Sequence, residues 1–257
     1  MTTSLDTLLP GGKGVWIPID HGITAYPEPG LNRMDALIPA LIAGGADAIV
    51  AQKGIVADWV DRTSFNGFVA HLSVSTVHGG QEASTKVLVG TAAAAQRRGA
   101  VAISAQVNLG THGSSRMIED LGRLTDEAHD LGIPVLGMVY PRGQHLVDVP
   151  GDRSNGAAHA ARLAYELGCS VVKVPWTGDK DSFTQVVEAV PIPVLIAGGT
   201  PDRPFLETLN TVAEALKAGA AGVCMGRAVF TSPDPERSVR ALVRLIHEGA
   251  TPPAAWG

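Results

Sequence analysis

The segment LGCSVV, residues 167–172, decides the fold that we predict for this chain. A glycine placed after a helical segment suits the left-handed backbone of a helix end, and the β-branched residues that follow suit a buried strand. The same joint recurs as GGADAIV at 44–50, RRGAVAI at 97–103, LGIPVL at 131–136 and AGAAGV at 218–223. This recurrence indicates helices that alternate with the strands of a parallel sheet.

Apolar runs with strand character follow one another along the whole chain. We identify eight, which are Val15–Asp20, Ala48–Gln52, Phe68–Val74, Val101–Val107, Pro134–Tyr140, Val171–Val174, Pro193–Ala197 and Gly222–Met225. The segments between them carry apolar residues at helical spacing. Eight strand–helix units in 257 residues match a single (β/α)₈ TIM barrel. We therefore predict one domain over residues 1–257, with an irregular Pro- and Ala-rich tail at 251–257.

Composition excludes several classes of partner. The formal charge of −5 and the absence of a Lys/Arg block argue against a nucleic-acid partner. No run of eighteen apolar residues predicts a membrane span, and residues 1–13 lack the features of a secretory signal. The two cysteines, Cys169 and Cys224, lie inside apolar runs. We expect two separate core thiols in a reducing cytoplasm rather than a disulfide.

Polar residues stand at the predicted carboxyl ends of the strands, where barrel enzymes place their active sites. In strand order they are Asp20-His21-Gly22, Gln52-Lys53, His71, Asn108, Tyr140-Pro141-Arg142-Gly143, Lys173, Gly198-Gly199 and Gly226-Arg227. A single polar residue at a strand end has several structural explanations, but many polar residues at the same end of the barrel indicate an active site.

Lys173 interrupts an apolar strand and is the candidate nucleophile. Side chains alternate between the two faces of a strand, so Lys173 lies on the same face as Val171, and Val172 and Val174 lie on the other face. On the barrel interior, desolvation would lower the pKa of the amine, and a neutral amine is the nucleophile that a carbonyl substrate needs. Two other interpretations stay open, a structural ion pair and a solvent-facing lysine. Lys53 is the alternative nucleophile on the rim.

Tyr140 and Asp20 are the candidate proton carriers. They close the fifth and first strands, which face each other across an eight-stranded barrel, so both side chains can approach one central point. The alternatives are a helix-capping aspartate and a core tyrosine. Arg142 is a candidate for binding an anionic substrate group, with a rim salt bridge as the alternative.

The glycine turns after strands seven and eight predict a phosphate site. They are Gly198-Gly199 and Gly226-Arg227, where barrels often bind phosphate through backbone amides. The alternative is that these glycines only allow the backbone to turn and bind no phosphate. His21, His71 and His78 show no HxH or HExxH spacing, so we predict neither a metal site nor a cofactor.

The sequence resembles the archaeal-type class I aldolase family. The motifs that carry the resemblance are IPIDHGITAYPEPGL at 17–31, HLSVST at 71–76, VNLG at 107–110, YPRG at 140–143, VVKVPWTGD at 171–179, IAGGT at 196–200 and GAAGVCMGRAVF at 219–230. The family includes fructose-bisphosphate aldolases and 2-amino-3,7-dideoxy-D-threo-hept-6-ulosonate synthases. It also includes a synthase that joins dihydroxyacetone phosphate to aspartate semialdehyde, and biosynthesis of aromatic amino acids or aminohydroxybenzoates is implied.

The resemblance implies a role for each rim residue. Lys173 would form a Schiff base, Tyr140 would donate a proton and Asp20 would accept one. The residues that would bind the phosphorylated substrate are His21, Gly22, Ile23, Thr24, Pro141, Arg142, Gly198, Gly199, Gly226 and Arg227. Related enzymes form rings, so we expect a homo-oligomer in which helices such as Asp234–His247 pack between subunits.

Other functions within the same fold stay open. They are a fructose-bisphosphate aldolase, a coenzyme-A-dependent thiolase that acts on a phosphorylated sugar signal, a phosphosugar-binding paralogue without activity, and a metal-dependent aldolase. The chain departs from the family at Tyr26-Pro27-Glu28-Pro29 and at Val174-Pro175-Trp176. These segments belong to the acceptor side of the site, so the identity of the aldehyde is the open question.

Overall fold

Strands and helices alternate as predicted in the computed structural model, which describes residues 5–198 and 203–257. Eight parallel strands close into a barrel in the order β1-β10-β9-β8-β7-β6-β3-β2, and β2 pairs with β1. Their bounds are β1 Gly14–Pro18, β2 Ala48–Gln52, β3 Phe68–His71, β6 Ala102–Leu109, β7 Val135–Pro141, β8 Val171–Pro175, β9 Val194–Ala197 and β10 Gly222–Cys224. The predicted TIM barrel is confirmed.

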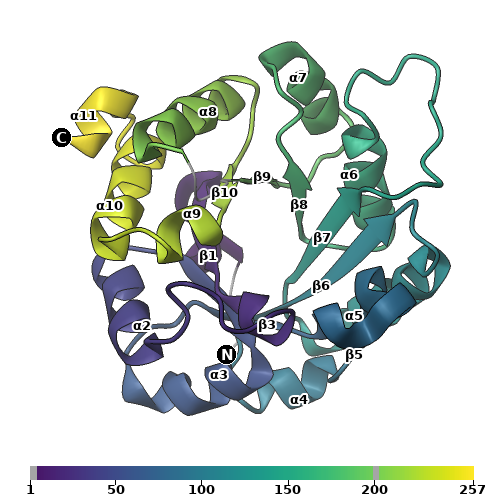
Figure 1. Ribbon diagram of the computed structural model, residues 1–257, viewed down its shortest axis with the longest axis horizontal. Helices are drawn as coiled ribbons and strands as arrows, with labels where there is room; N and C mark the ends of the chain where they lie inside the picture. Colours follow the sequence, from purple (N-terminus) through teal and green to yellow (C-terminus); the bar gives the residue numbers. More distant parts are fainter. Residues whose placement is uncertain (1–4, 199–202) are drawn as a thin grey trace.

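Helices surround the strands (Figure 1). The α-helices of the barrel are α2 Met34–Ala43, α3 Lys53–Trp59, α4 Ala92–Gln96, α5 Ser114–Leu131, α6 Ala157–Glu166, α7 Lys180–Glu188, α8 Phe205–Lys217, α9 Arg227–Phe230 and α10 Pro235–Ile246. Short 3₁₀ helices are η1 Pro10–Gly12, η2 Asp20–Ile23, η3 Val60–Arg62 and η4 Val77–Ser84. The longest, α5, ends at Gly132 in the left-handed conformation, as its joint predicts.

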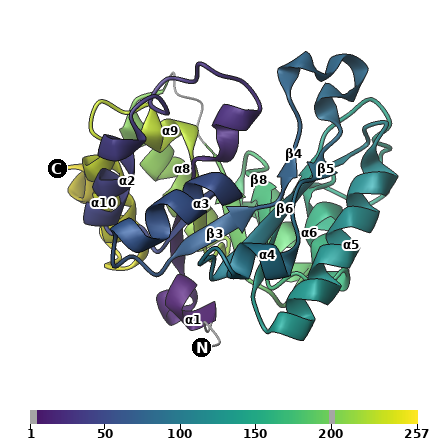
Figure 2. The same cartoon turned by 90° about the horizontal axis from the view of Figure 1, so that it is seen from below.

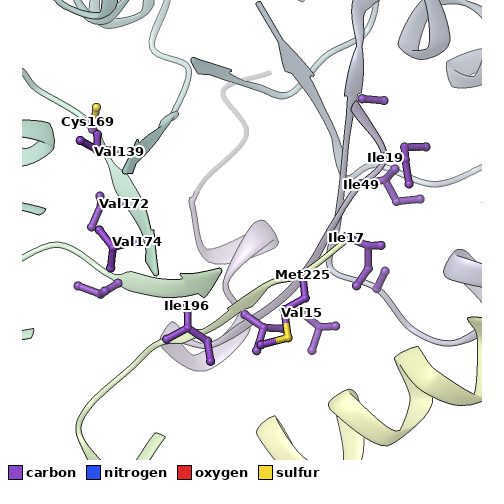
Figure 3. Packing of buried hydrophobic residues seen from close by; sticks show 14 of the residues in the cluster. Val15, Ile17, Ile19, Ile49, Val139, Cys169, Val172, Val174, Ile196 and Met225 are labelled. Atoms are coloured by element: carbon purple, nitrogen blue, oxygen red, sulfur yellow. The ribbon is translucent and has the colours of Figure 1, made fainter. Parts of the chain in front are cut away.

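Alternating side chains build two apolar layers. The inner layer fills the barrel with Leu8, Leu9, Trp16, Ala48, Val50, Val69, Ala102, Leu136, Met138, Val171, Leu195 and Cys224. The outer layer lies between strands and helices, and Figure 3 shows part of it, including Val15, Ile17, Ile19, Ile49, Val139, Cys169, Val172, Val174, Ile196 and Met225. Strands covered on both faces explain why the sequence shows continuous apolar runs.

The two ends of the barrel differ. The N-terminal helix α1, Leu5–Leu8, closes one end, where the indole Nε1 of Trp16 donates a hydrogen bond to the Leu8 carbonyl over 2.7 Å. At the opposite end lies a small antiparallel sheet of β4, Ser73–Val74, and β5, Val87–Leu88 (Figure 2). Loops and the small sheet therefore border the carboxyl ends of the strands, while the other end is filled with apolar side chains.

The predicted third strand is divided in the structure. We expected one strand over Phe68–Val74, but the barrel strand β3 ends at His71 and the chain then turns into β4. Leu72 joins the two, because its amide donates to Ser104 and its carbonyl accepts from Val89. The hairpin that follows, residues 73–91, crosses the rim before α4 begins, and our sequence prediction did not include this excursion.

The prediction of an irregular tail was wrong. Residues Pro252–Trp256 form helix α11, which packs against α8 and α10. The Trp256 ring lies 5.0 Å from the Phe205 ring, and Arg237 donates to the Trp256 carbonyl over 2.8 Å. Prolines at the first turn favour a helix start, since no intrahelical bond is lost there. Proline content alone was therefore a poor guide to this segment.

The apolar face of α10 is occupied within the chain. Ser238, Val239, Ala241, Leu242, Leu245 and Ile246 are buried against neighbouring elements, which include α2, α8 and α11. Packing of this helix between subunits therefore stays a prediction that would have to use its outer face. Neither cysteine forms a disulfide, and both thiols are buried as expected. No helix within the described ranges has both the length and the hydropathy needed to cross a membrane.

Barrel closure places a strict steric demand on Gly222. This residue pairs with Gly14 at the β1–β10 seam and has φ +136°, and an added Cβ would lie 2.1 Å from the Gly14 carbonyl oxygen. We predict that Gly222→Ala lowers stability by about 3 kcal/mol or more, and the melting temperature by at least about 6 °C. Differential scanning calorimetry measures both.

Gly249→Ala is the matched control for this prediction. Gly249 has φ +70° with nothing within 4 Å of the added Cβ, so only the backbone term of about 1–2 kcal/mol applies. Equal losses in the two variants would show that the seam tolerates a side chain, contrary to the register described.

Candidate active site

Lys173 lies on the barrel interior, as strand alternation predicts. It follows Val171 of the inner layer, pairs in register with Met138 and Leu195, and is 6% exposed. Its amine lies 5.9 Å from the centre of the Tyr140 ring and interacts with the Tyr140 hydroxyl and the Cys224 thiol. The interpretation as a solvent-facing lysine is thereby excluded, whereas a charge interaction with Asp20 does exist.

The expected direction of the Lys173 pKa was wrong. Burial acts to lower this pKa, but interactions with Cys224, Tyr140 and Asp20 outweigh burial and raise the pKa of Lys173, with Cys224 and Tyr140 contributing a negative charge only at alkaline pH. Burial also raises the pKa of Cys224 to about 11 and raises the pKa of Tyr140. Both of these groups are therefore neutral at pH 7, and Asp20 is the anion that stabilises the ammonium under those conditions. The alternation of side chains along β8 predicts that the Lys173 amine is buried, but it does not predict that the Asp20 carboxylate lies near it.

Asp20 lies at the start of η2, directly beyond β1. Burial acts to raise its pKa, but the positive charges of His71, His21 and Lys173 lower it below the ordinary value. Its two carboxylate oxygens lie 3.7 Å from His21 Nδ1 and 3.7 Å from His71 Nε2. Asp20 is thus a carboxylate at neutral pH, available to accept a proton.

His71 ends β3 beneath Asp20 and is almost fully buried. Its Nδ1 lies 2.8 Å from Ser104 Oγ, and its Nε2 lies 3.4 Å from Ser73 Oγ. Burial lowers the pKa of His71 to about 4, although the Asp20 carboxylate opposes this. The ring is therefore neutral at pH 7, and its bonds to Ser104 and Ser73 fix it beside the Asp20 carboxylate.

Tyr140 and Arg142 rise from the end of β7. The Arg142 guanidinium stacks 4.6 Å from the centre of the Tyr140 ring, and the Lys173 amine lies 5.9 Å from the same centre. The strands that carry Tyr140 and Asp20 are four steps apart in the barrel order, so they face each other across the barrel as predicted. Tyr140 keeps its proton at neutral pH, since its pKa is raised, and can donate it.

A chain of side-chain hydrogen bonds holds Arg142 in place. Its Nε donates to Asn108 Oδ1 over 2.8 Å, and the same oxygen accepts from Gln106 Nε2 over 2.8 Å. The Asn108 amide Nδ2 in turn donates to the Ser84 carbonyl over 2.6 Å. Asn108 thereby connects the end of β7 with the hairpin that crosses the rim.

The segment after Asp20 covers part of the rim. Gly22 is partly buried and faces Leu31, while Ile23 is largely exposed. The Thr24 carbonyl accepts a hydrogen bond from Val77, which joins this segment to the hairpin. These residues border the site, but the described contacts give them no direct link to Lys173.

The eighth-strand turn lies beside the first-strand segment. An added Cβ at Gly226 would lie 2.3 Å from the Pro18 carbonyl oxygen and 2.7 Å from the His21 ring, so the close approach requires glycine. The Arg227 side chain is exposed, and its charge reaches both His21 and Arg142. Gly198 is exposed after β9, and Gly199 lies outside the described residues.

Two predicted residues are not brought into the site. Pro141 points to the opposite face of β7 from Tyr140 and lines an outer cavity of about 560 Å³ beneath the loop at 145–156. Lys53 donates a hydrogen bond to the Val89 carbonyl, which engages its amine with the hairpin that crosses the rim. The position of Lys53 therefore disfavours it as the nucleophile.

Lys86 is the rim residue that sequence reasoning missed. It is 8% exposed, and its charge interacts with Asp20, His71 and Arg142. The signal was present, since Lys86 precedes Val87-Leu88-Val89 much as Lys173 adjoins its own apolar run. Among residues 5–198 and 203–257, no cluster of His, Cys, Asp and Glu side chains has the arrangement of a metal site.

Comparison with known proteins identifies the family. A sequence model described as DeoC/LacD family aldolase matches residues 15–232. The chain belongs to this aldolase family. Its relatives are named as synthases and aldolases, and the chain is accordingly an enzyme of the class I aldolase type.

Two curated relatives of this aldolase extend over nearly its whole length. The 2-amino-4,5-dihydroxy-6-oxo-7-(phosphonooxy)heptanoate synthase of Streptomyces griseus is 37% identical over 93% of this chain and 86% of the relative. The 2-amino-3,7-dideoxy-D-threo-hept-6-ulosonate synthase of Halobacterium salinarum is 38% identical over 99% and 94%. A solved structure titled as a Schiff-base-forming fructose-1,6-bisphosphate aldolase aligns with TM-score 0.85 and 27% identity, over 94% of this chain and 97% of that chain.

The neutral state of His71 predicts a pH-dependent stability. The unfolded histidine binds a proton below about pH 6.5, whereas the folded one does so only near pH 4. The unfolded state therefore holds more protons in this interval, so stability falls as the pH drops from 6.5 to 4. The loss is on the order of 3 kcal/mol.

Urea unfolding of the wild type and of His71→Asn at pH 7 and pH 4.5 measures this contribution. We expect the wild type to lose more stability than the variant between the two pH values, because asparagine binds no proton. Parallel losses in both proteins would contradict the buried, neutral state of the ring.

Proposed function

We propose that this enzyme is a Schiff-base aldolase in which Lys173 binds a phosphorylated ketone, such as dihydroxyacetone phosphate, and joins it to an aldehyde such as aspartate semialdehyde. One observation carries the proposal. The interior Lys173 amine is within hydrogen-bond reach of Tyr140 and interacts with the Asp20 carboxylate, at the end of the barrel where barrel enzymes react.

The protonation states of Asp20, Tyr140 and Lys173 at neutral pH determine which proton transfer we assign to each residue. The Asp20 carboxylate takes the proton that the Lys173 ammonium must lose before it can attack. The free amine adds to the ketone carbon, and the Tyr140 hydroxyl protonates the carbonyl oxygen, which gives a carbinolamine. Loss of water from the carbinolamine leaves the iminium of Lys173.

Carbon–carbon bond formation follows from the iminium. The Tyr140 phenolate removes a proton from the carbon beside the iminium, which gives the enamine. The enamine carbon attacks the aldehyde carbonyl carbon, and Tyr140 returns its proton to the new alkoxide. Water then adds to the iminium and releases the product from Lys173 as the ammonium. The proton that Asp20 had taken passes to the Tyr140 phenolate, so both groups return to their starting states and the cycle needs no cofactor, oxidant or reductant.

The positive rim favours a phosphorylated donor. Arg227 begins α9 directly after the turn at which Gly226 brings the backbone against β1. A guanidinium group beside a glycine turn suits a phosphate group. We propose that His21, Gly22, Ile23, Thr24 and the turn at Gly198-Gly199 border the same substrate.

The aldehyde is proposed from the names of the relatives. Both curated synthases form products named as seven-carbon acids, and one of these carries a phosphonooxy group at carbon 7. Such a product corresponds to a three-carbon phosphoketone joined to a four-carbon aldehyde that bears a carboxylate. Fructose-bisphosphate aldolase is the second candidate, favoured by the solved structure, and it would use the same donor with a phosphorylated aldehyde. We propose a cytoplasmic homo-oligomer.

Deuterium exchange into dihydroxyacetone phosphate tests the first half of this reaction without any aldehyde. We expect NMR to show that the wild type exchanges a proton on the carbon beside the carbonyl, because the enamine forms reversibly. Lys173→Met should abolish exchange, and Tyr140→Phe should slow it by about 10²–10⁴-fold.

Tyr165→Phe is the control, since Tyr165 is a surface residue of α6 and should exchange at the wild-type rate. Exchange that persists in Lys173→Met would contradict the proposal. Loss of exchange in Lys53→Met alone would identify Lys53 as the nucleophile.

A further inference from the structure

Lys86 is a buried cation that no step of the proposed mechanism uses. Only 8% of it is exposed, although a lysine is seldom buried without a partner. Within residues 5–198 and 203–257, its amine forms no hydrogen bond or ion pair. Desolvating an ammonium costs free energy unless an anion compensates it. The Asp20 charge acts on Lys86 without a direct ion pair, so an anion from outside the chain would complete the partners of this amine.

The backbone around Lys86 is fixed from two sides. Its amide donates to the Met117 sulfur of α5 over 3.3 Å, and Asn108 holds the Ser84 carbonyl two residues earlier. An added Cβ on Gly113 would lie 2.4 Å from Thr85, so the chain passes close to α5 at this point. Because the backbone of this segment is fixed, Lys86 can make a specific contact with a ligand at a small cost in conformational entropy.

A second cation stands beside Lys86. Asn108 binds Arg142 through Oδ1 and the Ser84 carbonyl through Nδ2, so one side chain joins Arg142 to the segment that carries Lys86. The charge of Arg142 lowers the pKa of Lys86, so the two positive groups lie close enough for their charges to interact. Two like charges held together beside the reacting groups are stabilised by a bound anion.

We propose that Lys86 and Arg142 bind the carboxylate of the acceptor aldehyde and so select that substrate, a role that rests on the proposed aldolase function. Lys86 lies on the hairpin between β3 and α4, whereas Arg227 lies across the rim after β10. The two anionic ends of the paired substrates would then lie at opposite sides of Lys173, with the reacting carbons between them.

A carboxylate fits this place better than a phosphate. The charge of Asp20 also acts on Lys86, so an anion that reaches Lys86 approaches the Asp20 carboxylate too. A single negative charge suffers less repulsion there than the nearly double charge of a phosphate. The planar fork of Arg142 matches the two oxygens of a carboxylate, and among the described residues its guanidinium uses only Nε in a hydrogen bond.

Steady-state kinetics with three aldehydes tests the proposal, each with dihydroxyacetone phosphate as donor. The aldehydes are succinic semialdehyde, butanal of the same chain length without the carboxylate, and glyceraldehyde 3-phosphate. We expect the wild type to favour succinic semialdehyde over butanal. Lys86→Met should lower kcat/KM for succinic semialdehyde by about 100-fold while changing that for butanal far less, and Lys86→Arg should restore part of the loss.

Lys217→Met is the matched control, because Lys217 lies exposed in an ion pair with Glu214 at the end of α8. It should leave all three reactions unchanged. Equal losses for succinic semialdehyde and butanal in Lys86→Met would overturn the proposal and assign Lys86 a structural role. A loss confined to glyceraldehyde 3-phosphate would overturn the choice of a carboxylate.

Deuterium exchange into dihydroxyacetone phosphate distinguishes failure of this inference from failure of the proposed function. Exchange in both the wild type and Lys86→Met, together with no preference between succinic semialdehyde and butanal, would remove the role of Lys86 alone. Absence of exchange in the wild type would remove both proposals.

Discussion

A charged amine inside an apolar barrel is stable only where an opposite charge reaches it, and Lys173 depends on Asp20 for this. The two residues come from β8 and from the segment after β1, which β9 and β10 separate in the barrel order. Closure of the barrel at the β1–β10 seam therefore sets where the carboxylate lies relative to the amine. The close packing at Gly222 and at Gly226 belongs to the same constraint, because both glycines hold β10 and its turn against β1.

Around this charge pair the rim divides into two sides. Arg227 and the glycine turn after β10 supply positive charge on one side, and Lys86 with Arg142 supplies it on the other. Neutral groups stand near the pair at pH 7, since burial keeps the proton on Tyr140 and on Cys224 and keeps it off His71. Such an arrangement gives one residue that can donate a proton and one that can accept it, beside a lysine whose charge changes during the proposed reaction.

The barrel and the inward direction of Lys173 could be predicted because both depend on local patterns. The repeated glycine joints mark helix ends, and a period of two decides which face of β8 the lysine occupies. The direction of its pKa could not be predicted, since that depends on the charges of residues more than thirty positions away in sequence. Lys86 was missed for a related reason. Its hairpin leaves the barrel after His71 and returns over the rim, and only the fold shows that it meets Arg142.

Covalent trapping tests the central role of Lys173 most directly. The chain would be incubated with dihydroxyacetone phosphate and sodium borohydride, digested, and mapped by mass spectrometry. We predict a stable adduct of the reduced imine on the peptide that contains residues 171–175, and no adduct there in Lys173→Ala. An adduct on another lysine, or the same extent of labelling in Lys173→Ala as in the wild type, would contradict a Schiff base on this amine.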